Sequence, residues 1–416
     1  MEIHRLTLTT FRGFKQAEFE FEPGMNLLVG INGVGKSTVL DALRITFSRI
    51  LPEFTACEEK HLNFNADDIR IGFDRLAVEV HFQASGIPFQ CNVSRGKSHD
   101  VKIKPNSSII LESIKKAGNQ PLVVYFSTRR SILTEKALNR NRSLDNQSAA
   151  FADALIPRML RLQEFTDWWL VQEELLDEKS DLAQRHLNAL NDAVRRFFDW
   201  FTDLRVLHTS AESKKTTLLL EKDGVTLNIN QLSDGERGIL ALILDLVQRL
   251  LQANPDLEDP LQDGKALVLI DELDLHLHPS WQRMVVQKLT EIFPNCQFIA
   301  TTHSPQIIGE VQPTGLILLK KENDQVVAIQ EGLQAFGLDS SWILKHLMET
   351  EPRNLRVQDQ INSIEDSLEE GDLELARNQL DTLKRMIYGR DDEVFRLEAS
   401  INNLEALADE VDSEEE

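Results

Sequence analysis

A glycine-rich segment near the start of the chain has the spacing of a phosphate-binding loop. Gly30-Ile-Asn-Gly-Val-Gly-Lys-Ser37-Thr38 matches the pattern G-x-x-x-x-G-K-[ST], and it lies between an apolar strand and a helix, as that pattern requires. Its glycines, such as Gly35, let backbone N–H groups curl around phosphate oxygens, and the helix N-terminus adds positive partial charge. Lys36 is expected to reach β- and γ-phosphates, and the Ser37 hydroxyl to ligate Mg²⁺. The segment predicts a site for a nucleoside triphosphate with Mg²⁺.

Two carboxylates end a second buried strand. Ala266-Leu-Val-Leu-Ile270 is continuously apolar, and Asp271 and Glu272 follow it directly. Asp271 is expected to hold the shell of Mg²⁺, and Glu272 to polarise an attacking water as a general base. A strand that ends in Asp-Glu is common by itself. Paired with the phosphate loop, it predicts hydrolysis of the bound nucleotide.

Two further segments are candidates for contact with a γ-phosphate. In Leu232-Ser-Asp-Gly-Glu236-Arg237, Ser233 and Glu236 have the spacing of a capping box, which explains the segment without any ligand. Its position before the second buried strand is, however, typical of a second phosphate-contacting helix end in one class of ATPases. His303 follows the strand pattern of Gln297–Ala300, at an edge where ligands gather in parallel α/β sheets. It is a second candidate for that contact.

The elements that must position these residues alternate between strands and helices, so the sequence predicts an α/β fold. Buried strands are expected at Met25–Val29, Pro121–Phe126, Ala266–Ile270 and Gln297–Ala300, with helices at about Ser37–Ile50 and Arg237–Leu251. Alternating apolar residues before position 22 and between positions 76 and 93 predict an antiparallel β subdomain. Helical periodicity is found from about 148 to 205 and again after about 340. The expected architecture is a mixed sheet with a parallel core, an antiparallel β subdomain, a helical insertion and a C-terminal helical appendage.

The order of the motifs resembles that of ABC-type ATPases, in the group related to RecF and the structural-maintenance-of-chromosomes (SMC) proteins. The resemblance implies an ATPase head, two copies of which sandwich two ATP molecules with Mg²⁺. Ser233 and Gly235 of one copy would touch the γ-phosphate bound to Lys36 of the other. His303 would be the switch histidine. The resemblance therefore implies a homodimer or a higher homo-oligomer.

The resemblance also assigns residues around the phosphate loop. It implies that Asn32 and Gly33 belong to the loop, and that Arg12, in Phe11-Arg-Gly-Phe14, lies near the nucleotide. The chain departs from ABC transporter subunits, which usually read Ser-Gly-Gly-Gln where this one reads Ser-Asp-Gly-Glu. No clear glutamine occupies the expected metal-contacting loop after the first helix, and Asn65–Ile69 lies nearest to that place.

A closer resemblance is to the PtuA-type ATPase subunits of Septu and retron-associated anti-phage systems. It is carried by the segments Ile270–Gln282, Phe293–Phe298, Thr302–Pro305 and Ala335–Ser340. In such systems the ATPase resembles a sensor or regulator that controls a separate HNH nuclease. The resemblance thus implies a slow ATPase with a nuclease partner. Two alternatives stay open: a DNA-repair or chromosome-maintenance ATPase that binds DNA directly, and a scaffold in which ATP is a structural ligand.

Length, composition and charge bound the remaining choices. The 416 residues are 42% apolar and 27% charged, as in globular proteins. The formal net charge of −22 is concentrated from Glu351 onward, where 20 acidic residues face 7 basic ones. The overall charge therefore gives no support for non-specific binding to DNA or membranes. Three scattered cysteines, and no apolar stretch near the ~20 residues of a membrane span, predict a cytoplasmic protein without a membrane contact.

Four parts are expected along the chain. Residues 1–147 would form an N-terminal ATPase lobe, 148–205 the helical insertion, 206–335 a C-terminal ATPase lobe, and 336–416 an acidic helical tail for oligomer or partner contacts. The ten histidines form no nuclease constellation, so a nuclease would have to come from a partner. His276 and His278 fit subunit contacts or packing better than metal binding.

Basic residues form small groups that an ordinary solvated surface explains, with a nucleic-acid patch as the alternative. These residues are Lys97, Lys102, Lys104, Lys115, Lys116, Arg129, Arg130, Arg140 and Arg142.

Overall fold

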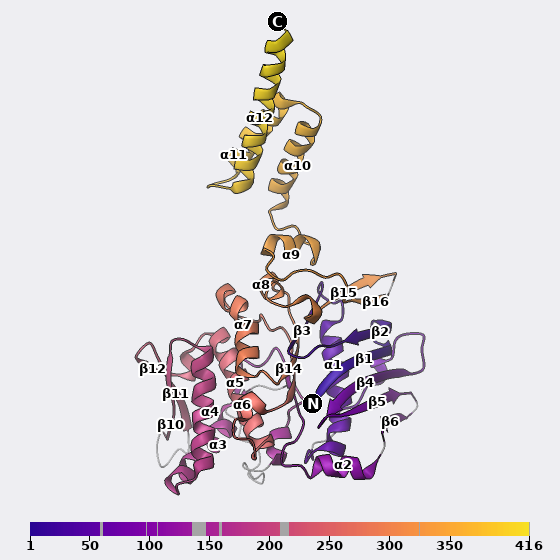
Figure 1. The fold of residues 1–416 in the computed structure, drawn as a ribbon, viewed down its shortest axis with the longest axis vertical. Helices are drawn as coiled ribbons and strands as arrows, with labels where there is room; N and C mark the ends of the chain where they lie inside the picture. Colours follow the sequence, from indigo (N-terminus) through magenta and orange to yellow (C-terminus); the bar gives the residue numbers. More distant parts are fainter. Residues whose placement is uncertain are drawn as a thin grey trace. The chain divides into compact units, whose positions relative to one another are not determined.

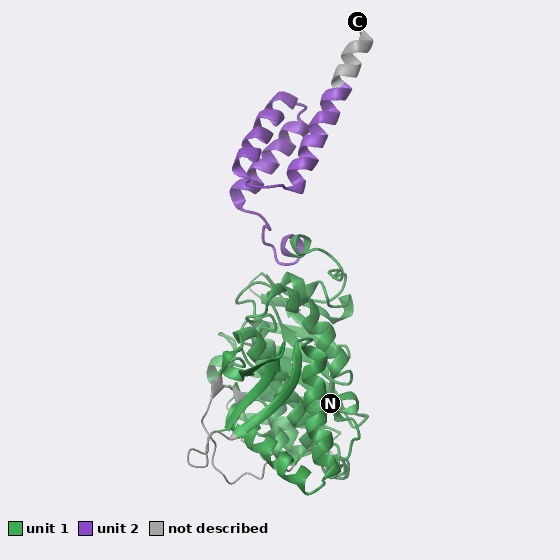
Figure 2. Ribbon diagram, turned by 90° about the vertical axis from the view of Figure 1, so that its left-hand side faces the viewer, with its two compact units in different colours: residues 1–343 green, residues 344–416 purple. Residues whose placement is uncertain are grey.

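The chain forms two compact units, Met1–Ile343 and Leu344–Glu416 (Figure 2). The computed structural model describes residues 1–58, 61–96, 98–105, 107–134, 147–157, 160–208, 216–323 and 325–415. Unit 1 contains every residue proposed for nucleotide chemistry, and unit 2 is a small helical bundle with its own core.

Unit 1 is built on a six-stranded sheet with the strand order β16-β15-β3-β14-β13-β7 (Figure 1). Its strands are β3 (Met25–Val29), β7 (Leu122–Phe126), β13 (Ala266–Ile270), β14 (Gln297–Thr301), β15 (Leu316–Glu322) and β16 (Gln325–Ile329). All neighbours are parallel except β15 and β16. Strands β3, β7, β13 and β14 are buried along their whole length, which explains their continuous apolar runs. Their carboxyl ends meet at one edge of the sheet.

A second, antiparallel sheet has the order β2-β1-β4-β5-β6. It consists of β1 (Glu2–Phe11), β2 (Phe14–Glu20), β4 (Leu76–Ala84), β5 (Ile87–Arg95) and β6 (His99–Lys104). Helix α1 (Lys36–Phe54) packs on both sheets: it touches β7, β13 and β14, and its Phe54 ring meets Phe82 and Phe89 of the antiparallel sheet. The helix that starts at the phosphate loop is therefore held firmly on two sides.

The other side of the six-stranded sheet carries helices from the middle of the chain (Figure 1). They are α3 (Leu162–Asp177), α4 (Asp181–Phe197), α5 (Asp234–Ala253), α6 (Pro260–Asp263) and α7 (Pro279–Ile292), and beside them lie β10 (Phe201–His208), β11 (Thr216–Lys222) and β12 (Val225–Asn228). Helix α5 touches β7, and α4 touches both α5 and α7.

Short elements complete unit 1. They are α2 (Ser108–Lys115), β8 (Leu133–Thr134), β9 (Leu160–Arg161), α8 (Pro305–Ile308) and the 3₁₀ turns Ala66–Asp68, Gln147–Phe151, Ile229–Gln231 and Pro313–Gly315. Helix α9 (Ser340–His346) spans the boundary between the units.

The helical region predicted from about residue 148 to 205 is wrong at its C-terminal end. The helical pattern predicted helix to about residue 205, whereas strand β10 begins at Phe201. Leu204 and Val206 of β10 are buried at alternate positions and pair with Leu220 and Leu218 of β11. The dense aromatic run before residue 201 hid this alternation.

Unit 2 contains α10 (Leu355–Glu369), α11 (Leu373–Met386) and α12 (Asp392–Glu415). Apolar residues at helical spacing form its core: Ile361, Ile364, Ala376, Leu380, Leu383, Val394, Leu397 and Ile401. No helix in the described parts of the chain is both long and apolar enough to cross a membrane.

Candidate nucleotide-binding site

The phosphate loop, Gly30–Thr38, joins β3 to α1, and its backbone needs glycine. Gly30 has a φ of 143°, and a Cβ atom there would lie 2.5 Å from the carbonyl oxygen of Leu319. Gly35 has a φ of 113° and lies against the ring of Phe14. It precedes α1 without a side-chain cap, and the first turn of α1 contains no acidic residue. The first N–H groups of α1 thus lack side-chain acceptors, which suits an anion.

The Lys36 side chain lies inside the loop. Its Nζ donates hydrogen bonds to the carbonyl oxygens of Gly30, at 2.8 Å, and Ile31, at 3.1 Å. The residue is only 7% exposed, and this burial lowers the pKa of Lys36 to about 8, although the nearby carboxylates of Asp274, Asp271 and Glu272, in the turn after β13, oppose the shift. Asn32 and Gly33 are exposed at the tip of the loop.

Asp271 links the loop to two strands. Its Oδ1 accepts hydrogen bonds from the Ser37 hydroxyl at 2.9 Å and from the Thr301 hydroxyl at 2.8 Å. Thr38 follows Ser37 in the first turn of α1 and is half-buried. The structure therefore brings Ser37 and Asp271 together across 234 positions of sequence.

These oxygen atoms fit Mg²⁺ bound together with a nucleotide. A hydroxyl beside one carboxylate is a donor set that Mg²⁺ accepts when phosphates and water supply its other ligands. No group of three or more His, Cys, Asp or Glu side chains in the described residues could hold a metal by itself. Ser37 and Asp271 would hold the ion, which neutralises phosphate charge when bound.

Glu272 occupies an unusual backbone conformation at the end of β13. Its φ is 49°, in the left-handed region that non-glycine residues rarely adopt. Its N–H donates to the Thr301 hydroxyl at 2.7 Å, and its carbonyl accepts from the Arg130 guanidinium at 2.5 Å. Arg130 also donates to the Asp271 carbonyl at 2.6 Å. The main chain that carries both carboxylates is thus fixed by hydrogen bonds on both sides.

Arg130 is a residue that the sequence interpretation misplaced. It was grouped with basic surface residues, but it is only 4% exposed, whereas its neighbour Arg129 is exposed. A usable signal existed: Arg130 follows β7 by four residues, and the carboxyl ends of parallel strands share one edge.

His303 lies at the same edge. Its backbone N–H and the Thr302 hydroxyl both donate to Oδ1 of Asp274, at 3.1 Å and 2.6 Å. Burial lowers the pKa of His303, and the nearby charge of Lys36 lowers it further. The ring is therefore neutral at neutral pH. Asp274, which the sequence interpretation did not single out, anchors the backbone of the candidate switch histidine.

Ser233 caps helix α5 and is exposed. The Ser233 N–H donates to Oε2 of Glu236 at 3.0 Å, and the Glu236 N–H donates back to Ser233 Oγ at 3.3 Å, so the capping box expected from the spacing is present. The Ser233 hydroxyl also donates to Oε2 of Glu236, at 2.8 Å. Lys222 of β11 donates to the other carboxylate oxygen of Glu236 at 2.5 Å and lies 4.9 Å from the centre of the Trp200 ring.

Gly235 is buried where α5 meets the segment after Glu272. A Cβ atom at this position would lie 2.4 Å from the carbonyl oxygen of His276. A side chain is therefore excluded, and the backbone of Gly235 contacts the chain that follows the carboxylates. Ser233, two residues earlier, is exposed to solvent.

Arg12 follows β1 and is half-exposed. It donates to Asp68 at 2.8 Å and to Asp41 of α1 at 2.7 Å. Burial opposes the charge of Arg12, but the hydrogen bonds to Asp68 and Asp41 outweigh it and raise its pKa. Asp68 belongs to the segment Asn65–Ile69, which thereby serves to hold Arg12.

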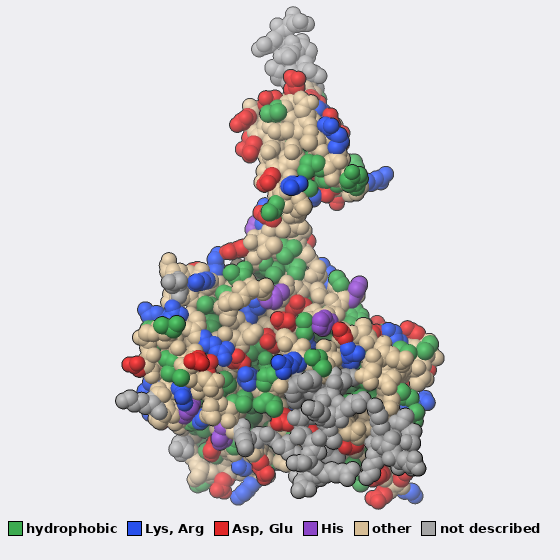
Figure 3. Space-filling model, turned by 180° about the vertical axis from the view of Figure 1, so that it is seen from behind, with side chains coloured by type: hydrophobic (Ala, Val, Ile, Leu, Met, Phe, Trp, Pro, Cys, Tyr) green, Lys and Arg blue, Asp and Glu red, His purple; other side chains and the backbone are tan. Residues whose placement is uncertain are grey.

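The remaining histidine and basic candidates have surface positions or lie outside the described residues. His276 is exposed, and Nδ1 of His278 accepts the Ser280 N–H at the start of α7. On the face of unit 1 drawn in Figure 3, basic and acidic side chains are interspersed. Lys97, Arg140 and Arg142 lie outside the described residues.

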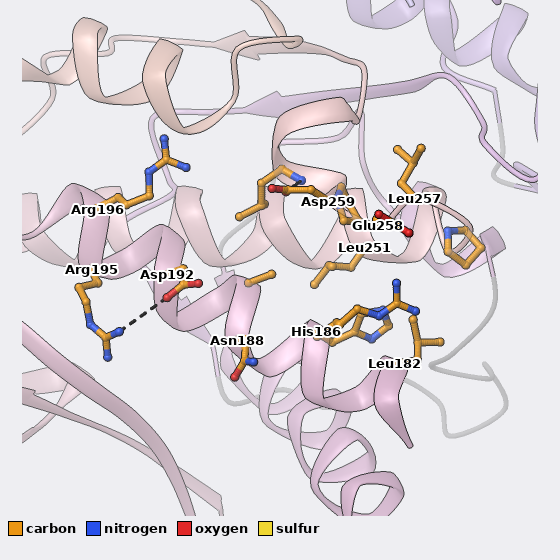
Figure 4. A pocket seen from close by; sticks show the side chains of 15 residues that line it. Leu182, His186, Asn188, Asp192, Arg195, Arg196, Leu251, Leu257, Glu258 and Asp259 are labelled. Atoms are coloured by element: carbon orange, nitrogen blue, oxygen red, sulfur yellow. Dashed lines mark hydrogen bonds and ion pairs between the residues drawn. The ribbon is translucent and has the colours of Figure 1, made fainter. Parts of the chain in front are cut away.

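A separate pocket of about 390 Å³ lies between α4 and the α5–α6 connection (Figure 4). It is lined by apolar residues such as Leu251 and Leu257 and by charged ones such as Arg195, which pairs with Asp192. None of the residues named above for nucleotide contact lines it, so it is distinct from the phosphate loop.

The sequence profile of the AAA_21 family, described as "AAA domain, putative AbiEii toxin, Type IV TA system", matches residues 25–309. That span runs from β3 past His303 and covers more than half of the chain. The chain belongs to this family. Its members are AAA-type ATPases, and the motifs at the shared edge of β3, β13 and β14 lie inside the matched region.

Individual relatives indicate a smaller group of similar proteins within this family. The chain is 27% identical to the "Retron Ec83 probable ATPase" of Escherichia coli, over 85% of this chain and 77% of the relative. It is 24% identical to the "Septu protein PtuA" of Bacillus thuringiensis, over 88% of this chain and 89% of that protein. The chain is thus an ATPase-family protein related to retron ATPases and PtuA, as the motifs indicated.

The fold is that of an SMC head. A solved SMC head bound to the C-winged helix domain of ScpA superposes with a TM-score of 0.50 at 15% identity, over 80% of this chain and 98% of the head. The predicted fold class is confirmed.

Proposed function

We propose that this protein is an ATP-hydrolysing switch in an anti-phage defence complex, where it controls a separate HNH nuclease. The hydrogen bond between Ser37 and Asp271 carries the ATPase part of the proposal, because it holds the phosphate loop beside the carboxylate expected to bind Mg²⁺. The relatives named for Septu and retron systems support the defence role.

In the proposed mechanism, one copy binds ATP through Lys36 and the first N–H groups of α1. Lys36 then exchanges its hydrogen bonds to loop carbonyls for bonds to the β- and γ-phosphates. Glu272 accepts a proton from the attacking water, and the neutral ring of His303 contacts the γ-phosphate. Arg12 contributes a positive charge near the nucleotide. Hydrolysis is slow because catalysis requires a second copy.

The second copy contributes the exposed start of its helix α5. The Ser233 hydroxyl and the Gly235 backbone contact the γ-phosphate bound by the first copy, so ATP closes a head-to-tail homodimer. The Ser233 hydroxyl must exchange its bond to Glu236 for a bond to phosphate, and Lys222 keeps the negative charge of Glu236 compensated. Hydrolysis at Glu272 then reopens the dimer.

The partner contacts are assigned to unit 2 and the helical insertion, in a cytoplasmic complex. Unit 2 exposes apolar side chains that its own core does not use, among them Leu355, Tyr388 and Phe395. We assign this surface to the nuclease or to further ATPase subunits.

The test is expression of the full chain with its untagged genomic neighbours. A small nuclease should copurify, and the sedimentation coefficient of Glu272→Gln should rise with ATP, while Glu272→Gln combined with Lys36→Ala should stay unchanged. Hydrolysis stimulated by DNA at moderate salt, without a copurifying nuclease, would favour the DNA-repair alternative instead.

A further inference from the structure

We propose that Arg130 is a positioning residue for ATP hydrolysis: its buried guanidinium holds the main chain of the turn Asp271–Leu273, and thereby aims the Glu272 carboxylate at the attacking water. The inference rests on the proposed ATPase function. The hydrogen bonds of Arg130 go to main-chain carbonyl oxygens, so its action runs through the backbone that carries Glu272.

The guanidinium contacts carbonyl oxygens along the whole turn. Nη1 donates to Asp271 at 2.6 Å and more weakly to Ser127 at 3.4 Å. Nη2 donates to Glu272 at 2.5 Å and more weakly to Leu273 at 3.4 Å. A planar fork of donors matches this row of acceptors, which a single lysine ammonium could not span.

The turn needs this support because the backbone of Glu272 has a left-handed conformation. A glutamate with positive φ persists only where its surroundings determine the backbone. Its N–H is held by Thr301 at 2.7 Å, and its carbonyl by Arg130 and by the Leu275 N–H at 2.9 Å. Without Arg130 the carbonyl loses its closest donor, and the φ of Glu272 is free to relax. The carboxylate would then leave the attacking position.

Arg130 also places a buried positive charge near the carboxylates of Asp274, Asp271 and Glu272. Burial lowers the pKa of Arg130 to about 10, and the nearby charges of Asp274, Asp271 and Glu272 oppose that shift. Arg130 therefore stays protonated at neutral pH.

The test compares two neighbouring arginines in the full chain. Arg130→Met is expected to lower kcat of ATP hydrolysis by about 100-fold while KM and ATP affinity stay close to wild type, since the phosphate loop is untouched. Arg129→Met is the matched control, because Arg129 is exposed. Arg130→Lys keeps the charge but not the fork, and its kcat should fall between those of Arg130→Met and wild type.

Each result has a definite reading. A kcat of Arg130→Lys equal to that of Arg129→Met would overturn the inference, even if Arg130→Met fails to fold. A parallel loss of ATP affinity and kcat in Arg130→Lys would also overturn it, since that pattern indicates general loss of structure. If wild type and Arg129→Met hydrolyse no ATP, the proposed ATPase function fails instead.

Discussion

Two regions proposed to contact the same γ-phosphate are built in opposite ways. At the carboxyl edge of the six-stranded sheet, the hydroxyls of Ser37 and Thr301 both donate to Asp271, although the three residues come from different parts of the chain. At the start of α5, the Ser233 hydroxyl is bonded to Glu236, three residues further along the same helix, and Ser233 is exposed. The first region joins distant parts of the chain, whereas the Ser233 hydroxyl takes its partner from its own turn of helix.

The difference indicates how a chain separates nucleotide capture from assembly. In the proposed mechanism, this edge would bind ATP in a single copy, because its donors and acceptors belong to one chain. The exposed cap would contribute when a second copy presents it. Substitutions at the edge should therefore act on the isolated protomer, and substitutions at the cap on the pair.

The largest effect is expected for Glu272→Gln. Removal of the general base should lower ATP hydrolysis by about 10²–10⁴-fold while ATP binding persists, because Lys36 and Ser37 are unchanged. Phosphate release and equilibrium binding of a fluorescent ATP analogue measure the two quantities. Unchanged turnover would remove Glu272 from the proposed catalytic role.

Lys36→Ala should weaken ATP binding by about 10–100-fold, as expected for loss of a charge-assisted hydrogen bond. Lys15→Ala is the control, since Lys15 is exposed on β2. Calorimetric titration with ATP and Mg²⁺ gives both affinities. Equal affinities for the two variants would contradict capture of phosphate by the pre-formed edge.

Gly235→Ala and Gly238→Ala form a matched pair within α5. The new Cβ at Gly235 would meet the His276 carbonyl at 2.4 Å, so we expect a loss of about 1–3 kcal/mol in unfolding free energy. At Gly238 the nearest atom, Cβ of Ser131, lies at 3.5 Å, and the helix propensity of alanine should instead add up to about 1 kcal/mol. Denaturant unfolding of both variants measures this, and equal shifts would refute the close packing of α5.

Ser233→Ala should have the smallest effect on the isolated protomer. Loss of the cap costs about 1 kcal/mol of stability, and ATP binding should be unchanged. ATP-dependent pairing, measured by sedimentation in the Glu272→Gln background, should nevertheless weaken. If ATP-dependent pairing of the Ser233→Ala variant were normal, the proposed difference between the edge and the cap would be wrong.

The edge could be predicted from the sequence because its signals are local. Continuous apolar runs marked β3, β13 and β14, and the residues that follow these strands had to meet at one edge. The end of β7 could in the same way place Arg130 near this edge, but the groups that Arg130 and Asp274 contact could not be predicted from it. Both side chains contact backbone groups of other segments. The spacing of residues in the sequence does not indicate which backbone group a buried side chain will contact.

The sequence pattern also failed to predict the boundary between α4 and β10, where helical and alternating periodicities overlap. Phe197, Phe198, Trp200 and Phe201 are all apolar, so neither a helical nor an alternating pattern stands out across the end of α4 and the start of β10. Contact with β11, which comes later in the chain, decides the boundary there.

The missing side chain at Gly235 has a mechanical consequence. With the His276 carbonyl filling the place of a Cβ atom, there is no slack between the first turn of α5 and the chain leaving Glu272. In the proposed mechanism, a displacement of that chain on phosphate release would reach the start of α5 through this contact. In a head-to-tail pair, each protomer would in this way transmit the state of its own nucleotide to the pocket of its neighbour, and the two hydrolysis events would not be independent.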